Sequence, residues 1–337
     1  RKESSAASDV YKRQAHARSR KVSANIVKGV HYLMRKNKIT EVNGHGTFCD
    51  AHTMEVTTAE GTVTISFDTC IIATGSHVAQ LPNVEMGGPV VSYEEQILNP
   101  QLPHSIVIVG AIGMEFAYVL ANYGVQVTIV EYQDRVLPNE DKDVSTEIAK
   151  QYRKLGITLR TGYKTTAVER TGSDPDSGVA VTIAPVTAAD VEPETIYAER
   201  CLISTGFRPN VEGYGLENTG VELTQRGAIA VDDVMRTSVS HIFAIGDVTA
   251  KLQLAHVAEA QGVVAVETIA GVETVSLGDY RMMPRATFCN PQVASFGLTE
   301  EQARAAAAEN PELDVRCLHS PSARMAKRKA WGKRRAS

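Results

Sequence analysis

The stretch "SIVIVGAIGMEFAYVL", residues 105–120, decides the fold. An apolar run rich in β-branched residues passes through a glycine turn into an amphipathic segment, which predicts a strand, a turn and a helix. A dinucleotide-binding unit begins in this way, but its turn normally carries three glycines as G-x-G-x-x-G. Here only Gly110 and Gly113 are present, as G-x-x-G. Three interpretations of this turn are open: it is a damaged nucleotide site, it is a different kind of turn, or it is not a binding site.

The sequence that follows favours a nucleotide site. The predicted helix has one apolar face and ends at Gly124, a suitable glycine for the position after a helix. The next strand, "VQVTIVE" (125–131), finishes at Glu131. An acidic residue about twenty positions after the first glycine accepts hydrogen bonds from the adenosine ribose of NAD and repels a 2′-phosphate. An ordinary βαβ crossover is the alternative.

Further along, the chain predicts a helix over 144–155, a strand over 157–163 and an antiparallel hairpin over 166–199. The strand "RCLISTG" (200–206) then ends in the same way as the strand "TCIIATGS" (69–76). Small residues at a strand end let a flat ring or a phosphate approach the backbone N–H groups, although one such end alone is usually a plain turn. Two of them predict two related nucleotide-binding domains.

The remaining predicted elements lie before and after the unit that opens at residue 105. Residues 15–37 show helical spacing of apolar side chains, which predicts one long helix with a buried stripe. Residues 39–67 alternate with period two and predict a small antiparallel meander. The strand "HIFAIGD" (241–247) ends at Asp247, before a helix near 252–262. Asp247 is placed to bind a sugar or ribityl hydroxyl, and a helix cap is the alternative.

Composition limits the class of protein. The 337 residues suffice for two domains with a substantial core, and the net charge of −4 is mild. The five cysteines are dispersed, with no C-x-x-C or C-x-x-x-x-C pair, so we expect free thiols in a reducing compartment and no metal site. No apolar run reaches the roughly 18 residues of a membrane span, and no signal peptide is recognisable. We therefore expect a cytoplasmic protein without a membrane partner.

The two ends differ from the middle. Residues 1–14, "RKESSAASDVYKRQ", resemble a translated sequencing adaptor, and we expect them to be non-native. Residues 324–335 are strongly basic, which is typical of a nucleic-acid patch. With permissible codon choices, however, residues 319–337 read two bases later can be translated into a strand-and-hairpin pattern, and a real basic tail is the alternative. We therefore expect 317–337 to be a frameshifted tail, and expect no nucleic-acid partner.

Many ordered motifs resemble one family. They are "IIATGS", "EEQIL", "GMEFAYVLANYGVQVTIVE", "LPNEDKDVS", "STGFRPN", "IFAIGDV", "LAHVAEAQG" and "PRATFCNPQVASFGLTEEQA". Over about residues 15–315 the chain resembles the bacterial dihydrolipoamide dehydrogenases, a group within the disulfide oxidoreductases. The resemblance implies an α/β fold with two Rossmann-like three-layer domains, which bind FAD and NAD, and the start of an α+β dimerisation domain.

This resemblance also implies domain limits. Residues 15–100 would be the first part of the FAD-binding domain, without its N-terminal strand, and 213–275 its return segment. Residues 101–212 would form the NAD-binding domain, and 276–316 the truncated start of the dimerisation domain.

The cofactor contacts are carried over from the same family. For FAD they are Gly46, Thr74, Gly75, Ser76, Asp247, Gln253, Leu254, Ala255 and His256. For NAD they are Gly110, Ala111, Ile112, Gly113, Glu115, Glu131 and Gly206, with Thr165 as a weaker candidate near the adenine.

In this family, dihydrolipoamide on the lipoyl domains of 2-oxoacid dehydrogenase complexes reduces a disulfide beside the flavin. Electrons pass to FAD, and reduced FAD delivers hydride to NAD⁺. The family's redox C-x-x-x-x-C precedes the first residue of this chain, and the His and Glu that the partner subunit of the homodimer supplies lie beyond its last. We therefore expect no catalytic residue in the chain and no activity from it alone.

Two other interpretations stay open. A glutathione or mercuric reductase shares many motifs, but relatives that use NADPH need a cation near the position of Glu131. In the second interpretation the chain is a non-catalytic nucleotide-binding module, with an unpaired sheet edge where the first strand is missing.

The family's turn is Gly-Ala-Gly-Ala-Ile-Gly, so a lost Gly-Ala pair would leave the turn of this chain too short to arch over a pyrophosphate. We expect weaker NAD binding than with the pair restored.

Overall fold

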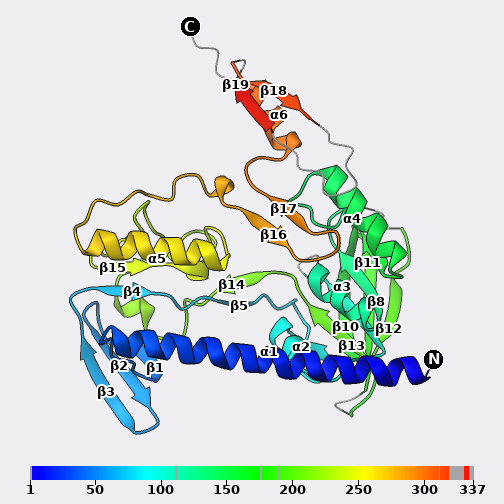
Figure 1. Ribbon diagram of the computed structural model, residues 1–337, viewed down its shortest axis with the longest axis horizontal. Coiled ribbons are helices and arrows are strands. Elements are labelled where there is room, and N and C mark those ends of the chain that lie inside the picture. Colours follow the sequence, from blue (N-terminus) through cyan, green and yellow to red (C-terminus); the bar gives the residue numbers. More distant parts are fainter. Residues whose placement is uncertain are drawn as a thin grey trace. The chain divides into compact units, whose positions relative to one another are not determined.

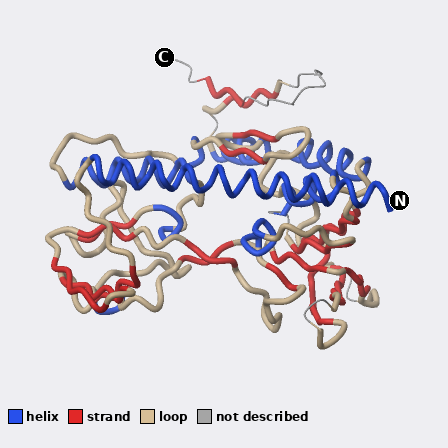
Figure 2. The backbone as a smooth tube through the Cα atoms, turned by 60° about the horizontal axis from the view of Figure 1, so that its bottom comes forward, coloured by secondary structure: helices blue, strands red, loops and turns tan. Residues whose placement is uncertain are grey.

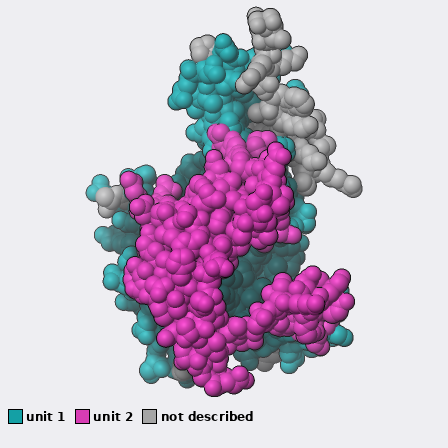
Figure 3. All heavy atoms as spheres, turned by 90° about the vertical axis from the view of Figure 1, so that its left-hand side faces the viewer, with its two compact units in different colours: residues 1–21, 78–206, 284–337 teal, residues 22–77, 207–283 magenta. Residues whose placement is uncertain are grey.

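The computed structural model describes residues 2–110, 113–174, 177–187, 190–310, 312–318 and 330–333. The chain divides into two compact units, each assembled from separated stretches. Unit 1 contains residues 1–21, 78–206 and 284–337, and unit 2 contains 22–77 and 207–283. Figure 3 distinguishes them as teal and magenta.

Unit 1 is built on a five-stranded sheet in the order β6-β13-β7-β8-β9, in which all neighbours are parallel. The strands are β6 (Val90–Val91), β7 (Ser105–Val109), β8 (Gln126–Glu131), β9 (Thr158–Thr161) and β13 (Arg200–Ile203). Residues 106–109 of the central strand β7 are all buried, as expected for a parallel sheet covered on both faces. The predicted α/β class is confirmed.

Three layers make up this unit (Figure 1). Helices α3 (Met114–Asn122) and α4 (Lys142–Lys154) connect β7 to β8 and β8 to β9, and their buried residues pack with Ile106 and Ile108. The other face, with Val107 and Val109, packs against an antiparallel sheet. That sheet consists of β10 (Tyr163–Arg170), β11 (Val179–Pro185) and β12 (Glu194–Ala198), where a hairpin was predicted. A short helix, α2 (Tyr93–Leu98), precedes β7.

The last part of unit 1 begins with a hairpin of β16 (Arg285–Thr287) and β17 (Val293–Ser295). Helix α6 (Glu300–Glu309) follows, and β18 (Asp314–Cys317) pairs with β19 (Ala330–Lys333). Most of the basic tail, residues 319–329 and 334–337, lies outside the described residues.

Unit 2 holds the predicted meander, formed by β1 (Gly44–Phe48), β2 (Thr53–Thr58) and β3 (Gly61–Ser66). Strand β4 (Cys70–Ile72) pairs in parallel with β15 (Ile242–Ala244), and β5 (Ser76–Val78) pairs with β14 (Phe207–Pro209). Helix α5 (Ala255–Ile269) follows β15. A core that includes Phe48, Ile72 and Ile242 joins the meander to the parallel pair.

The N-terminal helix differs from prediction. Helix α1 spans Lys2–Lys36, so it includes residues that look aperiodic, and Figure 2 shows it as one continuous helix. Its apolar stripe is exposed rather than buried, with Val22 at 47%, Ile26 at 64% and Leu33 at 50%. Helical spacing of apolar residues marks a face that can be buried, but burial needs a partner surface, and none of the described elements covers this stripe. Among the described residues, no helix is long and apolar enough to cross a bilayer.

Candidate functional site

The first candidate site is the edge of the parallel sheet where the chain changes direction. Strands β8 and β9 lie on one side of β7, whereas β13 and β6 lie on the other. In such sheets ligands bind outside the carboxyl ends of the strands at this switch point. Gly110 follows β7 and Gly206 follows β13, so the structure brings these two predicted residues to one edge.

Close packing of the two strand ends requires the glycines. Gly110 has φ +99, and a Cβ atom there would lie 2.2 Å from the Ser204 carbonyl oxygen. At Gly113 a Cβ atom would lie 2.2 Å from Ile108 Cγ2. Both glycines therefore have a packing role that needs no nucleotide. Ala111 and Ile112, between them, lie outside the described residues.

Helix α3 offers an anion site at its N-terminus. Its N-cap is Gly113, which provides no side-chain cap, and uncapped N–H groups together with the helix dipole attract phosphate. These donors fit a pyrophosphate. Glu115 lies in the first turn as predicted, and its Oε1 accepts a hydrogen bond from the Phe288 backbone N–H at 2.7 Å.

Glu131 ends β8, at the same edge as Gly110, whose N–H donates to the Val130 carbonyl at 2.8 Å. Glu131 is only 7% exposed, and its Oε1 accepts a hydrogen bond from the Gln133 N–H at 2.8 Å. A fixed carboxylate at this place fits a ribose hydroxyl pair and opposes a 2′-phosphate. Thr165 lies instead in β10, at a bulge of the antiparallel sheet. Its Oγ1 is buried and has no hydrogen-bond partner among the described residues.

Unit 2 contains the second candidate site. The Ile245 N–H donates to the Ile72 carbonyl at 3.0 Å, which sets the ends of β4 and β15 side by side. Ser76 Oγ then donates to Asp247 Oδ2 at 2.8 Å. Asp247 lies in the short 3-10 helix η3 (Gly246–Thr249), whereas the N-cap of α5 is Leu254. Asp247 therefore does not cap α5, which removes the simple alternative for this residue.

The other predicted flavin residues are spread more widely. Thr74 and Gly75 lie between β4 and β5 at this edge. Gln253 precedes α5, and its Nε2 is buried without a partner among the described residues. Helix α5 has no side-chain cap at Leu254, and its first residues, Ala255 and His256, are exposed. These donors, with the Ser76 and Asp247 pair, fit a ligand that carries phosphate and hydroxyl groups.

Gly46 lies apart from the ends of β4 and β15, in the antiparallel meander. It pairs with Val56 of β2, and a Cβ atom on it would lie 2.7 Å from Met54 Sδ.

One supporting residue was missed by sequence reasoning. Gln261 is fully buried in α5, and its Oε1 accepts a hydrogen bond from the Gly246 N–H at 2.6 Å. Its Nε2 donates to the Tyr280 hydroxyl at 3.0 Å. The side chain thus holds the turn that presents Asp247. The only signal in the sequence was a glutamine among the apolar positions of a predicted helix.

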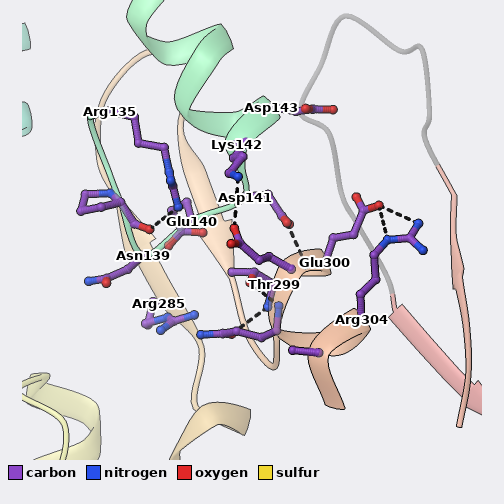
Figure 4. A pocket seen from close by; sticks show the side chains of 14 residues that line it. Arg135, Asn139, Glu140, Asp141, Lys142, Asp143, Arg285, Thr299, Glu300 and Arg304 are labelled. Carbon is purple, nitrogen blue, oxygen red and sulfur yellow. Dashed lines mark hydrogen bonds and ion pairs between the residues drawn. The ribbon is translucent and has the colours of Figure 1, made fainter. Parts of the chain in front are cut away.

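A pocket elsewhere in unit 1 contains none of the predicted cofactor residues. It has a volume of about 880 Å³ and lies where α4 and α6 begin. Figure 4 shows Asp141 Oδ1 accepting a hydrogen bond from the Glu300 N–H, at 2.8 Å. Lys142 pairs with Glu301 across the same space at 3.5 Å. These polar groups join the two helices.

The thiols give a test of burial at both sheets. Burial raises the pKa of Cys70 to about 11 and that of Cys201 to about 12, whereas Cys49 is exposed. Because only the thiolate is alkylated, iodoacetamide at pH 8 should modify Cys49 well before the other two. The rates at Cys70 and Cys201 should rise about tenfold per pH unit above pH 8 while the fold persists. Peptide mass spectrometry measures this, with urea-unfolded chain as control. Equal rates at Cys49 and Cys201 would contradict it.

The sequence profile described as "Pyridine nucleotide-disulphide oxidoreductase" matches residues 2–262. Dihydrolipoyl dehydrogenase of Corynebacterium glutamicum is 62% identical over 293 residues, which are 86% of this chain and 61% of the relative. The Mycobacterium tuberculosis enzyme is 59% identical with the same coverage. The Bacillus subtilis enzyme is 37% identical, over 86% of this chain and 62% of the relative. The chain therefore spans about three fifths of these relatives.

Solved structures share the fold. LpdA of Mycobacterium tuberculosis has a TM-score of 0.81 and 28% identity, covering 92% of this chain and 66% of that one. The HOCl-induced flavoprotein disulfide reductase RclA of Escherichia coli has a TM-score of 0.79 and 25% identity, covering 95% and 72%.

Proposed function

Because the chain belongs to the pyridine nucleotide-disulphide oxidoreductase family, we propose that it is the nucleotide-binding part of a dihydrolipoyl dehydrogenase. Relatives that are 56–62% identical over 86% of the chain carry that name. The whole enzyme would oxidise dihydrolipoamide through a redox disulfide and FAD, and reduce NAD⁺. The observation that carries the proposal is the uncapped N-terminus of α3 at one sheet edge with the fixed carboxylate of Glu131.

In this proposal NAD binds along the edge of the parallel sheet. The N–H groups at the start of α3 hold the pyrophosphate, and Glu131 receives the hydroxyls of the adenosine ribose. Gly110 and Gly206 allow the backbone to come close, and Thr165 is assigned to the adenine side. When bound, NAD supplies the hydride acceptor. The residues of this chain bind and orient it.

FAD is assigned to the edge formed by β4 and β15. Asp247, held by Ser76, would accept hydrogen bonds from ribityl hydroxyls, and the amide of Gln253 would donate to the cofactor. The uncapped start of α5 adds N–H donors. Thr74 and Gly75 would line the same edge, and Gly46, Leu254, Ala255 and His256 complete the proposed set. When bound, FAD supplies the electron relay.

We further propose the division into an NAD-binding domain (101–212), an FAD-binding domain (15–100 and 213–275) and the start of a dimerisation domain (276–316). The whole enzyme would be a cytoplasmic homodimer that serves lipoyl domains of 2-oxoacid dehydrogenase complexes. Dispersed free cysteines support a reducing compartment. Another disulfide reductase is the second candidate, favoured by the likeness to RclA, but the acid at Glu131 opposes one that uses NADPH.

Fluorescence titration of the chain with NADH and NADPH tests the proposal. NADH should bind at least about tenfold more tightly, because a 2′-phosphate would face the Glu131 carboxylate, and tenfold corresponds to about 1.4 kcal/mol. Glu131→Gln keeps the shape and removes the charge, so this preference should largely vanish. Glu147→Gln, on the exposed side of α4, is the control and should leave the preference unchanged. No NADH binding, or tighter NADPH binding, would overturn the assignment.

A further inference from the structure

Two carboxylates of unit 1, those of Glu115 and Glu140, accept hydrogen bonds from the β16–β17 hairpin. Glu115 accepts a hydrogen bond from the Phe288 N–H at 2.7 Å. Farther along the segment, Glu140 accepts one from Ser295 Oγ at 2.9 Å. Both contacts hold the β16–β17 hairpin with a charged acceptor, which makes strong hydrogen bonds. They differ in one respect, because only Glu115 lies in the first turn of α3.

The hairpin is fixed to α3 by packing as well. Cys289, 4% exposed, and Val293, 6% exposed, belong to the core that contains Met114 and Tyr152. The Tyr152 hydroxyl donates to the Met114 carbonyl at 2.8 Å, inside this core. Figure 1 shows the β16–β17 hairpin next to α3. The docked hairpin thereby delivers the Phe288 N–H to the first turn of that helix.

An acidic side chain in that turn competes with a bound anion. The uncapped N–H groups and the helix dipole attract any nearby negative charge. A carboxylate released from the hairpin would remain beside these groups and repel a phosphate at the same helix end. A carboxylate held by the Phe288 N–H has its charge partly satisfied elsewhere. Docking of the hairpin therefore changes how well the start of α3 accepts a phosphate.

We propose that Glu115 is a positioning residue, which couples binding of a dinucleotide phosphate at the start of α3 to docking of the β16–β17 hairpin. With the hairpin docked, the carboxylate is occupied and the phosphate site is favourable. With the hairpin released, the carboxylate opposes the phosphate. By linkage, a bound dinucleotide must strengthen docking by the same factor. The inference rests on the proposed nucleotide site at this turn.

Hydrogen exchange of the Phe288 amide, resolved by NMR or fragment mass spectrometry, tests the coupling. It is measured for the full chain with and without saturating NADH, beside a separate NADH titration. In the wild type, NADH should slow Phe288 exchange several-fold. In Glu115→Gln the amide oxygen still accepts a hydrogen bond but carries no charge, so exchange without NADH should be faster and NADH should no longer change it.

Glu140→Gln is the matched control, because it weakens a carboxylate contact to the same hairpin away from α3. It should speed exchange near Ser295 and keep the effect of NADH at Phe288. Loss of that effect in Glu140→Gln would overturn the assignment to Glu115. NADH binding without slower Phe288 exchange in the wild type would overturn the coupling alone. Absence of NADH binding would overturn the proposed function and the coupling together. In that case, hydrogen exchange at Phe288 without NADH still tests whether Glu115 positions the hairpin. If exchange is the same in the wild type and in Glu115→Gln, this positioning role is overturned as well.

Discussion

Gly110→Ala should lower the free energy of unfolding by about 2–5 kcal/mol, the sum of a left-handed backbone cost and a steric cost. The residue has φ +99, and its Cβ atom would lie 2.2 Å from the Ser204 carbonyl oxygen and 2.7 Å from the carbonyl carbon. Both neighbours are backbone atoms, which cannot rotate away as a side chain can. The ends of β7 and β13 must therefore separate, and NADH binding should be lost with them.

Gly124→Ala separates these two causes. Gly124 follows the C-cap of α3 with φ +87, but a Cβ atom there would meet nothing within 4 Å. Only the backbone cost remains, about 1–2 kcal/mol, and NADH binding should persist. Urea unfolding and NADH titration of both variants give the comparison. Equal losses of stability would show that the contact with Ser204 does not constrain this turn.

Tyr152→Ala should lower the free energy of unfolding by about 3–5 kcal/mol, as for other large aromatic residues removed from a core. Tyr152 is fully buried on α4 and packs against α3 and the β16–β17 hairpin. Its hydroxyl donates to the Met114 carbonyl at the first residue of α3. The substitution removes both the packing and the bond that fix the start of this helix.

Tyr152→Phe keeps the ring and removes the hydroxyl, so it should cost only about 1 kcal/mol. Tyr197→Ala is the surface control, since Tyr197 is 73% exposed on β12, and a change within about 0.5 kcal/mol is expected. Urea unfolding measures all three. A Tyr152→Phe loss as large as that of Tyr152→Ala would place the stabilisation in the hydrogen bond rather than in packing.

The parts that could be predicted from sequence depend on local pattern. The strand, helix and second strand around Gly110 follow from residue spacing alone, and β7, α3 and β8 confirm them. Ala111 and Ile112 of the turn lie outside the described residues. Gly110, Gly206 and Asp247 follow the ends of the parallel strands β7, β13 and β15, and Ser76 follows β4 after a short connection. The rule that parallel strands end at one edge therefore places Gly110 and Gly206 at one edge, and Ser76 and Asp247 at another.

What could not be predicted depends on partners distant in sequence. Glu115 and Phe288 are 173 positions apart, and no periodicity links them. Gln261 is buried because a backbone N–H and a tyrosine hydroxyl satisfy it, which composition does not reveal. The stripe of α1 has the spacing of a buried face, but burial is a property of two surfaces. The sequence shows the apolar surface of α1 but not a second surface that would cover it.

The place of Cys289 and Val293 in the core of unit 1 also bears on synthesis. The ribosome releases Met114 and Tyr152 long before these two residues, and all of unit 2 after residue 206 emerges in between. Since chains fold as they are made, from the N-terminal side, we expect the helical layer of the five-stranded sheet to stay uncovered in part until the hairpin is synthesised. The order of translation and the order of packing therefore differ, and unit 1 is completed late.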